Sequence, residues 1–128
     1  MTKDEFIKLF EIEKVYEKYK SKIPFCFGLH DNLTGTENAI FFIFSENKVK
    51  VVVECDELSE KNKKQRLEFH VILNNDKVEL NKDEIFICEL FPFLTFDTNF
   101  EASLKFIANF INKILIPKYQ LMGGVSTY

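Results

Sequence analysis

The feature that most constrains this chain is the apolar face of residues 100–116. When this stretch is drawn as a helix at 100° per residue, its apolar side chains fill a continuous arc of roughly 200°. A helix on the surface of a globular protein needs an apolar stripe only a little over about 100° wide. Residues 100–116 therefore need cover on two sides, for example from a sheet below and a second helix alongside.

Local signals predict where the two terminal helices begin and end. Thr98 and Glu101 have the T-x-x-E spacing of a capping box, and Pro117 is expected to stop the C-terminal helix. Thr2 and Glu5 repeat the capping box at the start of a predicted helix over residues 3–21. The apolar face of this first helix consists of Phe6, Leu9, Phe10, Ile12, Tyr16, Tyr19 and Ile23.

The central part of the chain reads as strands. Ala39–Phe44 is apolar throughout, as in a strand buried on both faces, and residues 49–55 alternate, so the two stretches predict a hairpin. A third alternating strand covers residues 67–73, and a short run over residues 77–80 precedes a polar break and a last strand at residues 85–91. Two segments are expected outside the sheet: residues 26–37 as a loop, with a short strand at most around 25–27, and residues 56–66 as a loop or exposed helix.

Helices at the two ends of a run of hairpin-connected strands predict the α+β class. We expect an antiparallel sheet of four or five strands with the N-terminal and C-terminal helices packed on one face. Residues 1–117 then form a single domain, and residues 118–128 form a C-terminal tail. A homodimer that covers part of the apolar arc of the last helix is the alternative to a monomer.

Composition excludes several classes of partner and site. A net charge of −3 argues against a nucleic-acid binder, and no apolar run reaches the roughly 18 residues of a membrane span. The first residues lack a secretory signal, so a cytoplasmic location is expected, with Cys26, Cys55 and Cys88 as reduced thiols. Neither phosphate-binding glycine motif nor a paired zinc-ligand spacing is present, so no cofactor and no metal are expected.

Only one segment places a thiol, a base and an acid close together in the sequence. Cys26, His30 and Asp31 lie within six residues, and they define the alternative of a small enzyme or ligand-binding domain. Turn residues beside a buried cysteine explain the same segment more simply. No carboxylate is expected on a strand face where burial would shift its pKa for acid–base chemistry.

A non-catalytic protein-binding module fits these observations best. Residues 26–60 hold seven acidic side chains and two lysines, which suits an immunity protein that neutralises a basic bacterial toxin. The residues expected to bind the partner are Asp56, Glu57 and Glu60, with His30 and Asp31 as a second patch.

Two other protein-binding functions remain open. A dimeric secretion chaperone would bind its effector through an apolar groove, for which Phe91–Phe96 is the candidate. A subunit of a larger assembly would dock through the C-terminal helix, at Phe106 and Phe110.

Overall fold

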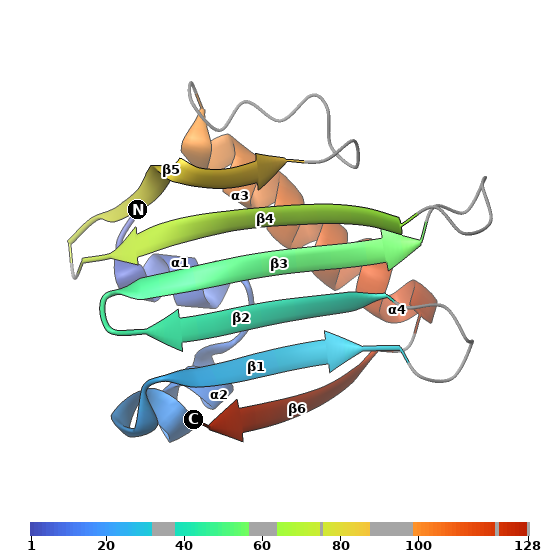
Figure 1. Ribbon diagram of the computed structural model, residues 1–128, viewed down its shortest axis with the longest axis horizontal. Coiled ribbons are helices and arrows are strands. Elements are labelled where there is room, and N and C mark those ends of the chain that lie inside the picture. Colours follow the sequence, from blue (N-terminus) through green and yellow to red (C-terminus); the bar gives the residue numbers. More distant parts are fainter. Residues whose placement is uncertain (32–37, 57–63, 75, 88–98, 120, 128) are drawn as a thin grey trace.

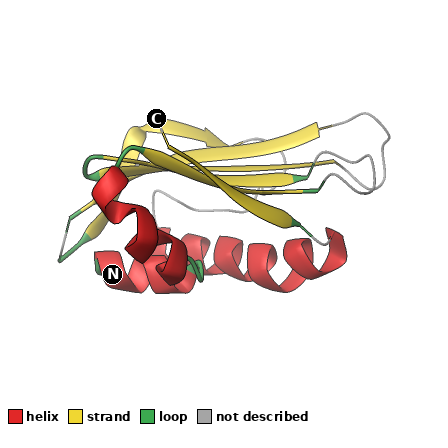
Figure 2. Cartoon of the chain, turned by 90° about the horizontal axis from the view of Figure 1, so that it is seen from below, coloured by secondary structure: helices red, strands yellow, loops and turns green. Residues whose placement is uncertain are grey.

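Six antiparallel strands form one sheet, and the helices pack on one of its faces (Figure 1, Figure 2). The computed structural model describes residues 1–31, 38–56, 64–74, 76–87, 99–119 and 121–127. The strand order is β5-β4-β3-β2-β1-β6. The predicted α+β class, with both helical ends on one face of the sheet, is confirmed, and the sheet has six strands instead of four or five.

The bounds of the elements follow from the chain order. The helical elements are α1 (Lys3–Leu9), α2 (Glu13–Tyr19), the 3-10 turn η1 (Lys20–Lys22), α3 (Phe100–Asn109), the π-helical turn η2 (Phe110–Leu115) and α4 (Ile116–Tyr119). The strands are β1 (Phe25–His30), β2 (Ala39–Ser45), β3 (Lys48–Asp56), β4 (Lys64–Leu73), β5 (Val78–Ile87) and β6 (Met122–Thr127).

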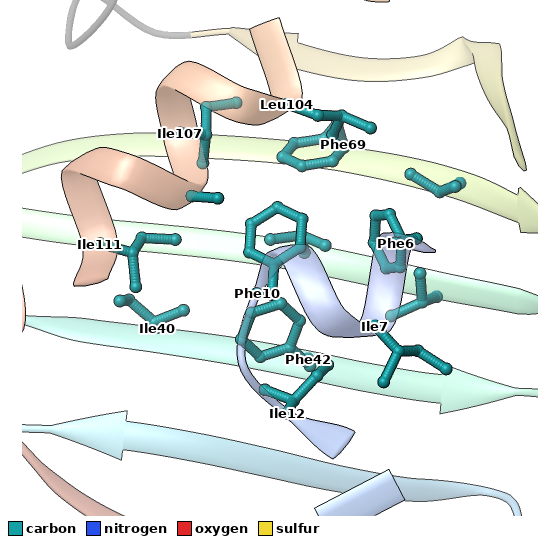
Figure 3. Packing of buried hydrophobic residues seen from close by; sticks show 14 of the residues in the cluster. Phe6, Ile7, Phe10, Ile12, Ile40, Phe42, Phe69, Leu104, Ile107 and Ile111 are labelled. Atoms are coloured by element: carbon teal, nitrogen blue, oxygen red, sulfur yellow. The ribbon is translucent and has the colours of Figure 1, made fainter. Parts of the chain in front are cut away.

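The core lies between the helices and the inward face of the sheet. Phe42, Val51 and Phe69 occupy adjacent register positions on β2, β3 and β4, and none is more than 1% exposed. The ring of Phe10 from α1 packs edge-on against Phe42, with the ring centroids 5.4 Å apart. Figure 3 shows Phe10 and the α3 side chain Ile107 over the same strands. Edge-to-face aromatic packing of this kind adds to the stabilisation from apolar burial.

The segment expected to be a C-terminal tail contains strand β6. Its residues pair with β1 in register, with Phe25 opposite Thr127 and His30 opposite Met122. The loop expected at residues 26–37 is shorter for the same reason, because β1 continues to His30 between β2 and β6. Strand pairing between distant segments overrides the turn signals of glycine and asparagine in these stretches.

Strands β3, β4 and β5 are longer than expected. Asp56 pairs with Lys64, so both ends of the predicted 56–66 loop or helix are strand, and residues 57–63 lie outside the described residues. The polar break at residues 81–84 is a bulge within β5, where the register shifts between Phe69 and Val71 of β4.

Two helices replace the single helix expected over residues 3–21. Between α1 and α2, Glu11 adopts the left-handed conformation with φ 56°. On one continuous helix the side chains of Ile7 and Ile12 would point about 140° apart. Both are 4% exposed in the core, because the break lets each helix turn its own apolar residues toward the sheet.

The helix caps agree with the sequence at one end only. Thr2 and Glu5 form the predicted capping box, in which the Glu5 amide donates to the Thr2 hydroxyl at 3.2 Å. The cap of α3 is Asn99, whose side chain accepts a hydrogen bond from the amide three residues ahead. Thr98 lies outside the described residues, and Glu101 does not complete a capping box with this cap.

The C-terminal helix does not stop before Pro117. It widens into η2, where the Ile116 amide donates to the carbonyl of Ile111, five residues back. This wider turn immediately precedes the proline, whose ring clashes with the carbonyl four residues back in a regular α-helix. The sheet covers one side of the apolar arc, but Phe106 and Ile114 are 40% and 48% exposed, so the second side is covered less completely than expected.

Replacing Glu11 with glycine should raise the free energy of unfolding by about 0.5–1 kcal/mol, because glycine adopts the left-handed conformation without a Cβ clash. The control Lys18→Gly places glycine inside α2 and should lower the same free energy by about 0.5–1 kcal/mol. Urea denaturation of both variants measures the difference, and a destabilised Glu11→Gly protein would contradict the break in the helix.

Candidate functional site

The outward face of the sheet carries a group of paired charges. No helix of the described residues lies over this face, since the helices pack on the other one (Figure 2). Antiparallel pairing places Lys50 of β3 opposite His70 of β4, and Glu54 opposite Arg66. We call these four side chains together with Glu68 the charged cluster, and the surface that bears them the outer face.

Glu68 is the centre of the charged cluster. Its carboxylate lies 2.6 Å from Arg66 Nη2, 3.2 Å from Lys50 Nζ and 3.5 Å from His70 Nε2. The other terminal nitrogen of Arg66 lies 3.1 Å from Glu54 Oε1. The Glu68 side chain is only 10% exposed, so these charge-assisted bonds are partly shielded from water. The cluster is therefore a connected network whose side chains hold one another in place.

Two opposing effects set the pKa of Glu68. Burial raises the pKa because it disfavours the charged carboxylate, whereas hydrogen bonds from Arg66, Lys50 and His70 favour the charged form and lower the pKa below its usual value of 4.5. A lowered pKa in the folded state means that ionised Glu68 stabilises the fold above pH 4.5. This stabilisation is lost as the pH falls through the lowered pKa.

Apolar side chains surround the charged cluster on the outer face. Phe41 lies opposite Val52, and Ile43 lies opposite Lys50, in the pairing of β2 with β3. The ring of Phe41 lies against Gly28 of β1, where an added Cβ would approach the ring to 2.8 Å. We call Phe41, Ile43, Val52 and the β4 residue Ile72 the apolar surround.

The three loop acids expected to bind a partner lie just beyond the charged cluster. Asp56 is the last residue of β3, two positions after Glu54. The side chain of Asp56, and the whole of Glu57 and Glu60, lie outside the described residues. Their role in binding stays a prediction, and the structure adds that the acidic stretch continues from the strand that carries part of the cluster.

His30, Asp31 and Cys26 do not form one site. His30 ends β1, and Asp31 is 4% exposed, with its amide donating to the Asn38 carbonyl at 2.9 Å across the base of loop 32–37. Because Asp31 is buried, it offers little surface to a partner. Cys26 and His30 are four residues apart in one extended strand, so their Cα atoms are separated by about 13 Å and the thiol cannot reach the imidazole.

The sequence analysis missed the role of Glu68. The expectation that no carboxylate lies on a strand face with a burial-shifted pKa is wrong, because Glu68 is both buried and shifted. Alternation with Leu67 and Phe69 does indicate its outward direction. Its charged partners depend on the register of β3 against β4, and Arg66 was expected in a loop or helix.

Comparison of the chain with protein-family models, curated proteins and solved structures returned no match. In the part of the chain that the structure describes, no three His, Cys, Asp or Glu side chains are grouped to hold a metal ion. None of the described helices is both long enough and apolar enough to span a membrane. Function therefore has to be inferred from the chemistry of the surface.

Glu68→Gln should lower the free energy of unfolding by about 2 kcal/mol at pH 7, because the amide gives up charge-assisted hydrogen bonds in a partly buried network. The difference from the unmodified protein should shrink at about pH 3.5, where Glu68 itself becomes protonated. Urea denaturation at both pH values measures this change.

Glu79→Gln is the matched control, since Glu79 is exposed and its carboxylate lies 3.4 Å from Lys77. An exposed pair of this kind contributes little, so this variant should keep its stability within about 0.5 kcal/mol. Equal stability of Glu68→Gln and the unmodified protein at pH 7 would contradict the importance of the cluster.

Proposed function

We propose that this chain is a non-catalytic protein-binding domain whose binding surface is the outer face of the sheet. One observation carries the proposal: a charged cluster that is already paired lies among apolar side chains on a face that no described helix covers. The separation of Cys26 from His30 along β1 removes the thiol–imidazole pair that favoured an enzyme.

The apolar surround supports a protein partner. An antiparallel sheet with one face toward water usually carries polar side chains there. On β2 and β3 the outward positions include Phe41, Ile43 and Val52 instead. Protein interfaces combine an apolar centre with aromatic residues and a limited number of fixed polar groups. The outer face has this composition over its central strands.

The charged cluster supports specific recognition. Ordering a long charged side chain at an interface costs about 0.5–1.5 kcal/mol when the side chain is mobile in the free protein. Ion pairs to Glu68 already restrict Lys50 and Arg66, so part of this cost falls on folding instead of on binding. The cluster therefore gives a partner a defined arrangement of donors and acceptors.

The acidic character of the chain indicates the class of partner. The net charge is −3, and the stretch Asp56–Glu60 extends from the end of β3 beside the cluster. Complementary charge raises the rate of association and selects among partners. We infer that the partner is a basic protein, and that the chain acts as an immunity protein that neutralises a bacterial toxin.

A capture experiment with three immobilised proteins tests this function: the unmodified chain, Ile43→Arg on the outer face, and Ile114→Arg as a control at an exposed position of η2. Lysate of the native host is passed over each protein. We expect one basic protein to bind the unmodified chain and the control but not Ile43→Arg. That protein should be toxic when expressed alone and harmless when the chain is co-expressed.

Two outcomes would contradict the function. Capture of the same partner by all three proteins would place binding elsewhere on the molecule. A captured protein that is harmless alone would reject the immunity role. Urea denaturation of Ile43→Arg shows whether the variant remains folded, and Phe41→Ser provides a second change on the same face.

Replacing Asp56, Glu57 and Glu60 together with alanine should weaken binding of the captured partner at least tenfold and reduce its dependence on salt, because these charges would steer a basic protein. The stability of the free chain should not fall. Isothermal titration calorimetry over a range of salt concentrations measures both effects on binding.

The matched control replaces three other exposed acids with alanine: Glu13, Glu46 and Asp76. These residues lie in α2 and in the turns after β2 and β4, away from the end of β3. Equal loss of affinity in the two triple variants would show that only the net charge matters, and unchanged affinity in the first would reject the assignment of these residues.

A further inference from the structure

A groove of about 500 Å³ lies between α2 and the β1–β6 edge of the sheet. Its apolar lining consists of Val15, Tyr19, Phe27 and Val125. The backbone of Gly123 and Gly124 in β6 forms the opposite wall, and Lys14 and Lys18 of α2 complete the lining. The groove is thus apolar inside and basic along its helical side, and it lies on the helix side of the sheet, apart from the outer face.

The two lysines of the groove are not neutralised by the described residues. No acidic side chain lines the groove, and neither Lys14 nor Lys18 forms an ion pair within the described part of the chain. Lys18 lies over the ring of Tyr19, 5.5 Å from its centroid. By contrast, Lys20 lies 2.7 Å from the carboxylate of Glu17. The groove therefore offers two positive charges to an acidic ligand.

The strand beside the groove is the edge of the sheet. β6 pairs with β1 on one side, and no strand of the described residues pairs with its other side. An edge strand presents backbone N–H and C=O groups that can pair with another extended chain. A Cβ placed on Gly124 would meet nothing within 4 Å, so space is open beside the backbone at this position.

We propose that the edge of β6 and the adjoining groove bind an extended segment of a partner protein with apolar and acidic side chains. The segment adds to the sheet as a seventh strand, which accounts for the unpaired edge. Side chains on its inward face enter the groove beside Val125, and acidic side chains reach Lys14 and Lys18. This binding site does not depend on the function proposed for the outer face.

The spacing of the two lysines suits an extended chain. Lys14 and Lys18 are one helical turn apart, so their Cβ atoms are separated by roughly 6 Å. Side chains on one face of a strand repeat at nearly the same distance, about 7 Å. A segment with acidic residues at every second position therefore matches both lysines, whereas a small anion would leave the strand edge unused.

A fluorescein-labelled peptide of about seven residues with alternating valine and glutamate is the probe for this site. We expect it to bind the full chain, to shift the amide NMR signals of Gly123 and Gly124, and to bind less tightly at high salt. A matched peptide with lysine in place of glutamate should bind at least tenfold more weakly. Exchanging both lysines in Lys14→Glu/Lys18→Glu should reverse the preference between the two peptides.

Three results would overturn the proposal. The first is no amide shift in β6 at millimolar concentrations of the valine–glutamate peptide. The second is unchanged binding of peptides N-methylated at alternate amides in either register, because strand addition requires those N–H groups in one register. The third is an unchanged preference in the charge-exchanged variant. If dodecanoate shifts groove signals while the peptide does not, the groove is a site for a small amphipathic anion instead.

Discussion

The one-sided packing of helices on the sheet is the constraint on which the rest of this structure depends. Phe10 of α1 packs on Phe42 at the centre of β2, and Ile107 of α3 lies over the same layer. This packing requires the left-handed break at Glu11, because a continuous helix would turn part of its apolar face away from the strands. It also leaves the opposite face of every strand without a helical cover.

The outer face meets this situation in an unusual way for a sheet exposed to water. Its centre holds Glu68, nearly buried, with Arg66 and Lys50 bound to the carboxylate. Removing a carboxylate from water is expensive, and a buried ion pair is often no more stabilising than well-packed apolar residues. Such a network is therefore better explained by recognition than by stability alone. The apolar residues around it, Phe41 and Ile43 among them, supply the area that a protein partner would cover.

Patterns within single segments predicted most of the sheet and the side on which the helices pack. The apolar run Ala39–Phe44 and the alternation of the next strand were enough for the β2–β3 hairpin. What could not be predicted depends on contacts between distant segments. β6 contains Gly123 and Gly124, which disfavour a strand locally, and only pairing with β1 makes it one. The partners of Glu68 likewise follow from the register of β3 and β4, so its outward direction was readable and its chemistry was not.

Hydroxyl-radical footprinting of the chain with and without its captured partner tests most directly that the outer face is the binding surface. The account predicts that oxidation of Phe41, Ile43 and Ile72 falls when the partner is bound, while Ile114 on the helical side stays as reactive as in the free chain. Protection of Ile114 with no change at Phe41, Ile43 and Ile72 would contradict it, because the partner would then cover the helices and leave the outer face open to solvent.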